Sequence, residues 1–211
     1  MKGLLSLLNI NTRGGKPSDE HTDSVLFSTA FAGQGVDDSM LVPWEARAVE
    51  IGAKRLPTSR GGKLLQGLWA KDKYMAHLDK DAVERMERFF EFASVPAGRD
   101  VIRQDEYGNF MVVLLTGTIA VDRVQPWGEQ LRLAETRPGD ILGEMSLLDS
   151  GIRFSACTTL TDCEIAVLSA EAMDDMMTKD PQLAASLIAL LARKLSLRLR
   201  VVSARLSDNQ K

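Results

Sequence analysis

A short stretch in the second half of the chain has residue types and spacing suited to binding a ligand. Gly143 and Glu144 can begin a single helical turn, whose first backbone N–H groups have no partner within the turn and are free to bind an anion. Arg153, nine residues beyond Glu144, can bring a guanidinium fork to the same anion. Glu144 fits beside an anion only if it accepts hydrogen bonds from hydroxyl groups. The combination is therefore typical of a ribose phosphate site, and its plain alternative is a Glu144–Arg153 ion pair on a surface turn.

The residues on both sides of this stretch predict a small antiparallel barrel or roll that would position it. Between residues 93 and 170, short runs rich in Val, Ile, Leu and Thr alternate with Gly, Pro and Asn turns. The expected strands are Val101-Ile102, Phe110–Leu115, Thr118–Val124, Gln130–Ala134, Ser155–Leu160 and Glu164–Leu168. We therefore expect an α+β fold, with an antiparallel, jelly-roll-like β-roll flanked by N-terminal helices and a long C-terminal helix.

Helical periodicity precedes and follows the expected strands. Residues 64–92 predict two helices, the second over Asp81–Phe92 with Asp79 or Asp81 as its N-cap. A short helix over Ala170–Thr178 and a long helix from Pro181 are expected after the roll. The long helix has two apolar stripes. One can pack on the roll while the other pairs with a second copy in a parallel coiled coil, unless both form one wide stripe buried in the monomer.

The first 63 residues have the Gly, Pro and Ser content of loops and linkers. An apolar stripe at residues 4–8 and a short helix from Trp44 to Ile51 interrupt them. We expect residues 1–63 to be an arm that is partly disordered or docks a partner, or else a tail without a role. Residues 64–211 are expected to form the domain.

Composition excludes several classes of protein. The 211 residues carry a net charge of −3, which divides into +1 over residues 1–70, −9 over residues 71–180 and +5 over residues 181–211. Two cysteines without a CxxC spacing and two histidines, His21 and His77, make a metal site improbable, and no Ser/His/Asp or Cys/His set indicates an enzyme. Neither a membrane span nor a signal peptide is expected, so we place the protein in the cytoplasm with both cysteines reduced.

The sequence resembles the cyclic nucleotide-binding domain family, which includes bacterial catabolite activators and protein kinase regulatory subunits. The resemblance covers about residues 78–206 and includes Tyr107-Gly108-Asn109-Phe110, Pro138-Gly139-Asp140 and the spacing from Gly143-Glu144 to Arg153. Only five residues follow the last helix, so the resemblance implies a stand-alone member without a helix-turn-helix domain and without specific DNA binding.

The resemblance also implies a ligand and its contacts. Glu144 would accept the ribose 2′-hydroxyl, Arg153 would pair with the cyclic phosphate, and backbone amides of Ser146 and Phe154 would complete the phosphate site. Arg198 on the last helix would reach the base, or else lie on a solvated basic face. The implied cyclic-nucleotide-binding residues are Gly143, Glu144, Met145, Ser146, Arg153, Phe154, Ser155 and Arg198. The expected ligand is cAMP, with cGMP as an alternative, and no metal is required.

Three functions follow from these expectations. The first is a cyclic nucleotide receptor that signals to a protein partner through movement of its C-terminal helix. The second is a degenerate scaffold that keeps the fold and binds no nucleotide. The third is a protein that binds nucleic acid or a membrane surface through the basic C-terminal helix.

Overall fold

The computed structural model describes residues 26–76 and 78–208, and its centre is a roll of two antiparallel sheets. One sheet has the strand order β1-β2-β9-β4-β7 and the other the order β3-β8-β5-β6. The strands are β1 (Lys54–Arg55), β2 (Glu91–Val95), β3 (Asp100–Ile102), β4 (Phe110–Thr116), β5 (Ile119–Val124), β6 (Gln130–Glu135), β7 (Ile141–Leu142), β8 (Ala156–Thr159) and β9 (Cys163–Ser169). The predicted β-roll is confirmed.

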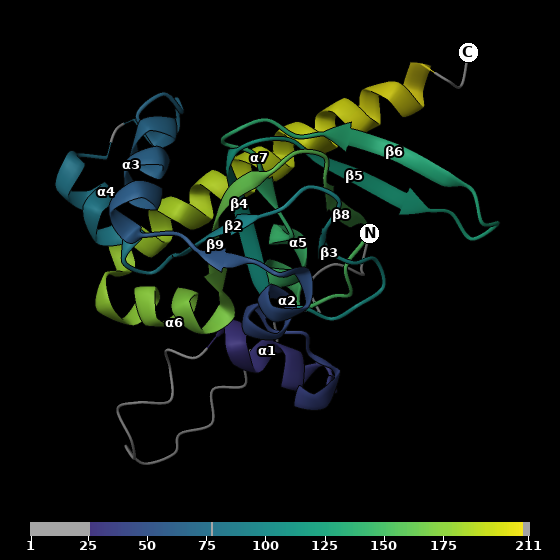
Figure 1. Cartoon of the computed structure of the whole chain (residues 1–211), viewed down its shortest axis with the longest axis horizontal. Coiled ribbons are helices and arrows are strands. Elements are labelled where there is room, and N and C mark those ends of the chain that lie inside the picture. Colours follow the sequence, from purple (N-terminus) through teal and green to yellow (C-terminus); the bar gives the residue numbers. More distant parts are fainter. Residues whose placement is uncertain (1–25, 77, 209–211) are drawn as a thin grey trace, which may run out of the picture.

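The helices surround this roll (Figure 1). Figure 1 shows α3 and α4 side by side at one end, α6 below them, and α7 running behind the sheets toward the C-terminus. The helices are α1 (Phe27–Gly33), a 3₁₀ turn (Asp38–Met40), α2 (Trp44–Ile51), α3 (Thr58–Trp69), α4 (Lys80–Glu87), α5 (Glu144–Asp149), α6 (Ala170–Lys179) and α7 (Pro181–Asp208). The helices predicted from Trp44, Ala170 and Pro181 are confirmed. In the described part of the chain, no helix combines the length and apolar content needed to span a membrane.

Strand β4 explains why the middle of the sequence reads as strongly apolar. Its alternate residues face two different cores, since Met111, Val113 and Leu115 pack against the helices and Phe110, Val112 and Leu114 point into the roll. The first core lies between the larger sheet and helices α3, α4, α6 and α7. The second lies between the two sheets and is closed at one end by α2. A strand buried on both faces shows a continuous apolar run instead of an alternating one.

The second predicted helix of the leading segment is shorter than expected. Asp79 caps it by accepting a hydrogen bond of 2.7 Å from the amide of Ala82, as predicted, but the helix ends at Glu87. Residues 91–95, which include the last part of the expected helix, instead form β2 and pair with β9 along its length. Phe92, the last residue of the expected helix, fits a helix face and a strand equally well, and pairing with β9 decides in favour of the strand.

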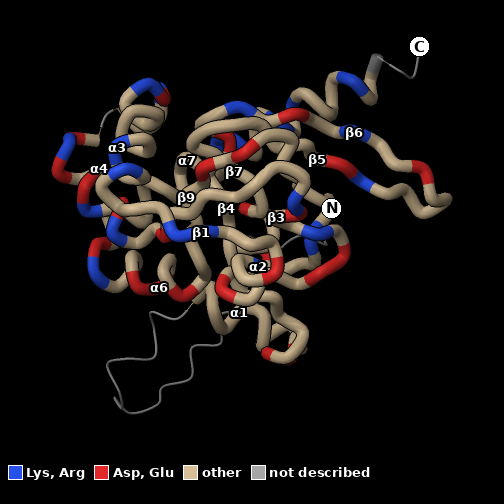
Figure 2. Tube along the Cα trace, in the orientation of Figure 1, with Lys and Arg blue, Asp and Glu red and all other residues tan. Residues whose placement is uncertain are grey.

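Helix α7 has two different halves. In the first half both predicted stripes face the core, where Leu187, Leu190 and Leu191 are buried. In the second half, apolar residues such as Leu199 and Val202 are exposed beside the β5–β6 hairpin. Figure 2 shows Lys and Arg recurring toward the C-terminal end of α7, whereas acidic residues are spread over the rest of the described chain.

The segment that precedes α3 packs against the roll. We call residues 26–55 the N-terminal strap. Asp174 of α6 accepts hydrogen bonds from the amides of Leu26, Phe27 and Ser28 at 2.8–2.9 Å, and β1 pairs with β2 at the other end of the strap. The boundary expected between residues 63 and 64 falls inside α3. Residues 1–25, including the predicted apolar stripe, lie outside the described residues, and the partner-docking role of the arm stays a prediction.

Candidate functional site

A cavity of about 740 Å³ lies between the roll and the second half of α7. We call residues 143–155 the cassette; α5 forms its first part and Arg153 lies near its end. The residues predicted for the ligand all line this one cavity: Gly143, Glu144, Met145, Ser146, Arg153, Phe154, Ser155 and Arg198. The fold therefore brings the cassette and the last helix together around one space.

Two glycines make room for the guanidinium of Arg153. A Cβ on Gly143 would lie 2.6 Å from its Nη1 atom, and a Cβ on Gly108 would lie 2.8 Å from its Nε atom. Gly143 also has a φ of 74°, in the left-handed region, where it begins α5. Glycine is the residue that adopts this conformation at least cost. Both glycines are thus explained by the place that Arg153 takes.

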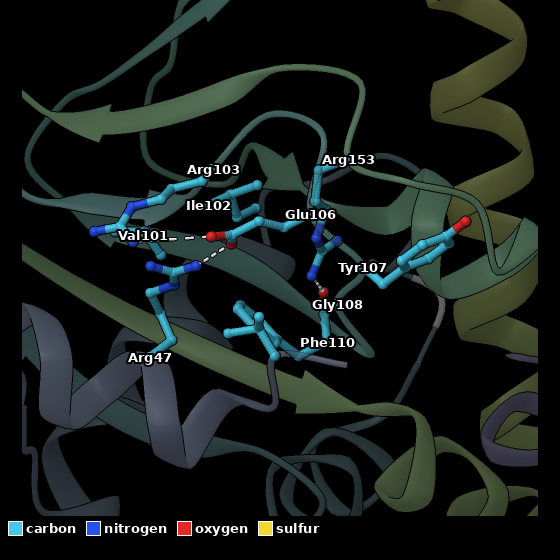
Figure 3. Close-up of a pocket in the computed structure, with 10 residues that line it drawn as sticks. Arg47, Val101, Ile102, Arg103, Glu106, Tyr107, Gly108, Phe110 and Arg153 are labelled. Atoms are coloured by element: carbon cyan, nitrogen blue, oxygen red, sulfur yellow. Dashed lines mark hydrogen bonds and ion pairs between the residues drawn. The ribbon is translucent and has the colours of Figure 1, made fainter. Parts of the chain in front are cut away.

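Arg153 is buried and has no carboxylate partner within the described chain. Its Nη1 atom donates to the carbonyl oxygen of Gly143 at 2.7 Å. Its Nη2 atom donates to the carbonyl oxygen of Phe110 at 2.5 Å, as Figure 3 shows. The guanidinium also lies 4.8 Å from the centre of the Phe110 ring. Burial lowers the pKa of Arg153 to about 10, which still leaves it cationic at neutral pH. A buried cation paired only with carbonyl groups is costly, and a bound anion relieves that cost.

Glu144 is held by the last helix. The residue is 4% exposed, and its carboxylate forms an ion pair with Arg198 of α7. Arg198 also donates to the carbonyl oxygen of Ile141 at 2.8 Å. Burial raises the pKa of Glu144, and the nearby charge of Arg198 partly opposes this effect. The structure thus places Arg198, predicted to contact a base, on the acid predicted to accept a ribose hydroxyl.

The remaining cassette residues differ in exposure. Ser146 is buried in the first turn of α5, whereas Met145 beside it is half-exposed. Phe154 is also half-exposed, and the guanidinium of Arg123 from β5 lies 3.9 Å from the centre of its ring. Arg123 also donates to the carbonyl oxygen of Phe154. This contact ties the end of the cassette to the β5–β6 hairpin.

Sequence reasoning missed the apolar wall of the cavity. Its members come from β5, β6 and α7, and they are Val121, Leu133, Leu197, Val201 and Val202. On α7 they recur at helical spacing, which was interpreted as packing within the monomer or against a second copy. Only the folded chain brings them opposite the cassette. An apolar wall in a cavity that also holds Arg153 and Glu144 suits a ligand with a flat ring and a charged end.

No group of metal-binding side chains is found among the described residues, and His21 and His77 lie outside them. Cys157 and Cys163 are free, buried and on different strands, β8 and β9. Burial raises the pKa of the Cys157 thiol to about 12, so this cysteine is not a reactive thiolate at neutral pH.

Comparison with known protein families matches residues 92–180 to the family described as "Cyclic nucleotide-binding domain". The Cyclic AMP receptor protein of Thermus thermophilus is 30% identical over 118 residues, which are 56% of this chain and 55% of that protein. A CRP-like cAMP-activated global transcriptional regulator of Mycobacterium tuberculosis is 25% identical over 118 residues, 56% of this chain and 53% of that protein. The chain thus spans about half the length of the curated relatives it matches.

Two solved structures extend this comparison. A cyclic nucleotide-binding domain from Methylobacillus flagellatus superposes with a TM-score of 0.67 at 21% identity, covering 72% of this chain and 86% of that one. At this identity the likeness shows the fold alone. The catabolite activator protein of Thermus thermophilus superposes with a TM-score of 0.54 at 29% identity, covering 63% of each chain.

Proposed function

We propose that this chain, whose residues 92–180 belong to the cyclic nucleotide-binding domain family, is a cytoplasmic receptor for a cyclic nucleotide, with cAMP as the preferred ligand. The observation that carries the proposal is Arg153, a buried cation without a carboxylate partner in the described residues, at the edge of a cavity that also holds Glu144 and an apolar wall. The choice of cAMP over cGMP rests on the names of the matched relatives. The proposed role is regulatory and not catalytic.

Each part of a cyclic nucleotide has a counterpart in the cavity. The cyclic phosphate would bind the guanidinium of Arg153 together with backbone amides at Ser146 and Phe154. The ribose 2′-hydroxyl would donate to Glu144, and the base would lie against Val121 and Leu133 of the apolar wall. For this to happen, Arg153 must exchange at least one of its two carbonyl partners for a phosphate oxygen, which is a stronger, charge-assisted partner.

The pairing of Arg198 with Glu144 supplies a route from the ligand to α7. A ribose hydroxyl and the guanidinium of Arg198 would compete for the same carboxylate. Ligand binding would then release this contact and change the position of the second half of α7, whose surface would be read by a protein partner. The shift requires a ligand that binds the released state more tightly than the paired state.

The exposed half of α7 also supports a homodimer as part of the proposal. Leu199, Val202 and Leu206 follow one another at spacings of three and four and are all more than half exposed. Sedimentation at several concentrations should detect a dimer that Leu199→Glu converts to a monomer. A wild-type chain that remains monomeric at all concentrations would contradict this part of the proposal.

The degenerate scaffold has one observation in its favour. Glu144 and Arg153 both have partners within the chain, so neither needs a ligand to be hydrogen-bonded. The scaffold predicts that no nucleotide binds, whereas the receptor predicts that a nucleotide displaces these partners. Binding measurements therefore separate the two functions directly.

The experiment is a calorimetric titration with cAMP, cGMP and a cyclic dinucleotide. We expect saturable binding of cAMP that Arg153→Ala abolishes. Arg60→Ala is the matched control, because Arg60 of α3 is exposed and pairs with Glu164, which does not line the cavity. Absence of binding with every nucleotide would overturn the receptor proposal, and binding unaffected by Arg153→Ala would overturn the site.

A further inference from the structure

We propose that Arg47 of the N-terminal strap is a positioning residue for the anion site, because it binds the carboxylate of Glu106 and so keeps that carboxylate from neutralising Arg153. The inference rests on the proposed function, in which Arg153 binds the phosphate. Arg47 lies outside residues 92–180, the part of the chain that matches the family.

Arg47 is enclosed between α2 and the roll. The residue is only 1% exposed, and one of its terminal nitrogens forms an ion pair with Glu106 (Figure 3). The other forms an ion pair of 2.5 Å with Glu50. Arg103 also lies near both acids, but its side chain is nearly half-exposed and its nearest contact is with Glu50. Arg47 is therefore the buried counterion of Glu106.

Glu106 and Arg153 are neighbours across a pair of backbone segments. The amide of Arg153 donates to the carbonyl oxygen of Glu106 at 2.8 Å, and both side chains line a small cavity of about 10 Å³. The charge of Glu106 raises the pKa of Arg153 and the charge of Arg47 lowers it, so both act on the same guanidinium. Without Arg47, Glu106 keeps, among the described residues, only the longer contact of 3.8 Å to the nearly half-exposed Arg103. Arg153 is then the buried arginine of this cavity that can compete for the carboxylate.

The strap fixes Arg47 in place through contacts to the segment that leads into β4. The amide of Val42 donates to the carbonyl oxygen of Tyr107 at 2.9 Å. The ring of Trp44 packs edge-on against Phe110, with 5.6 Å between centroids. Phe110 also provides a carbonyl partner and a ring face to Arg153. The strap thus packs against Phe110 behind the guanidinium of Arg153, and it also supplies the counterion of Glu106.

The decisive experiment compares Arg47→Met with the double variant Arg47→Met/Glu106→Gln. In the single variant the freed carboxylate pairs with Arg153, so we expect cAMP to bind about tenfold more weakly. In the double variant no carboxylate is left to compete, so affinity should return to within about twofold of the wild type. If Arg47 only stabilised the fold, removing Glu106 as well would not restore the affinity for cAMP. An unchanged affinity in Arg47→Met, or no recovery in the double variant, would overturn the proposal.

A third variant keeps the test decisive if Arg47→Met does not fold. Glu106→Gln alone removes the competing charge and should bind cAMP about twofold more tightly than the wild type. Weaker binding would mean that Glu106 supports the site instead of opposing it, which would overturn the proposal.

A measurement without ligand separates this inference from the proposed function. The Nε–Hε resonance of Arg153 in nuclear magnetic resonance spectra, assigned with Arg153→Lys, reports whether a carboxylate has reached the guanidinium. It should shift in Arg47→Met and return in the double variant. If the wild type bound no nucleotide, the proposed function would fail, but the shift would still report whether Glu106 pairs with Arg153 once Arg47 is removed. An unshifted resonance in Arg47→Met would overturn the positioning role.

Discussion

Two regions on either side of the cassette hold their charged residues in different ways. On the side of the N-terminal strap, Arg47 is buried and pairs with Glu106 beneath the segment that carries Arg153. On the side of α7, the side chain of Arg198 is 47% exposed and pairs with the buried Glu144. In the strap pair the arginine is the buried partner, with 2% of its side chain exposed against 30% for Glu106, whereas in the α7 pair the buried partner is the carboxylate, at 5%. The exposed Arg198 can move into solvent and leave Glu144 to a ligand, but Arg47 would remain a buried charge without its partner. The strap side is therefore suited to preparing the site and the α7 side to responding to a ligand.

The strap is also packed more tightly than the second half of α7. Trp44 and Ile51 of the strap belong to the core inside the roll. Most of the second half of α7 is exposed, including Leu199 and Val202. Local openings of a protein are easiest where few apolar contacts must be broken. We therefore expect ligand binding to change amide exchange in the second half of α7 more than in α2.

The largest expected effect is on the stability of the strap side. Trp44→Ala removes a buried aromatic ring between α2 and the roll and should lower the free energy of unfolding by about 3–5 kcal/mol. Val49→Ala is the matched control on the same helix, because Val49 is exposed, and it should change stability by less than about 0.5 kcal/mol. Denaturant unfolding measures both. Equal effects of the two variants would mean that Trp44 does not hold α2 against the roll.

The next effect concerns the acid that both the ligand and α7 would use. Glu144→Ala should weaken cAMP binding by about 2 kcal/mol, or about 30-fold, because the ribose hydroxyl loses its charged acceptor. Glu129→Ala, at the turn of the β5–β6 hairpin, should leave the affinity unchanged, since Glu129 does not line the cavity. Calorimetric titration measures both affinities. Wild-type affinity in Glu144→Ala would place the ribose elsewhere.

A smaller effect of opposite sign is expected on α7. If Arg198 competes with the ligand for Glu144, Arg198→Ala should tighten cAMP binding by about 1 kcal/mol, or about fivefold. Arg200→Ala, two residues further along the same helix, does not alter the cavity lining and should have no effect. Weaker binding in Arg198→Ala would instead make this residue a ligand contact, as the sequence predicts, and not a releasable partner of Glu144.

The smallest effect is on the pH dependence of stability. Because burial raises the pKa of Glu144 in the folded state, the folded protein binds this proton more tightly than the unfolded chain does. The contribution of Glu144 to stability should therefore fall as the pH rises from the ordinary carboxylate value of 4.5 through the raised pKa. The difference in the free energy of unfolding between the wild type and Glu144→Gln should change only across that pH interval. A constant difference at all pH values would mean that the pKa of Glu144 is not raised.

The cassette could be predicted from sequence because its parts are close together in the chain. Gly143, Glu144 and Arg153 are carried by one turn and the following segment, so their spacing alone indicates an anion site next to a carboxylate. The strands of the roll were also predictable, apart from β2 and the short β1 and β7. Residues 91–95 fit a helix face as well as a strand, and pairing with β9 decides between them.

The rest of the site depends on contacts between distant segments. Arg198 reaches Glu144 across 54 residues, and Arg47 reaches Glu106 across 59. No local pattern specifies that one arginine becomes buried while the other stays half-exposed. Their roles follow from tertiary packing, in which the strap is held by Trp44 and α7 extends beyond the core.

A crystal structure of the chain with cAMP tests the central claim most directly. We expect the cyclic phosphate on the guanidinium of Arg153, the ribose hydroxyl on Glu144, and Arg198 moved away from that carboxylate. The ion pair between Arg47 and Glu106 should remain in place. A nucleotide bound outside this cavity, or bound within it without contact to Arg153, would contradict the account.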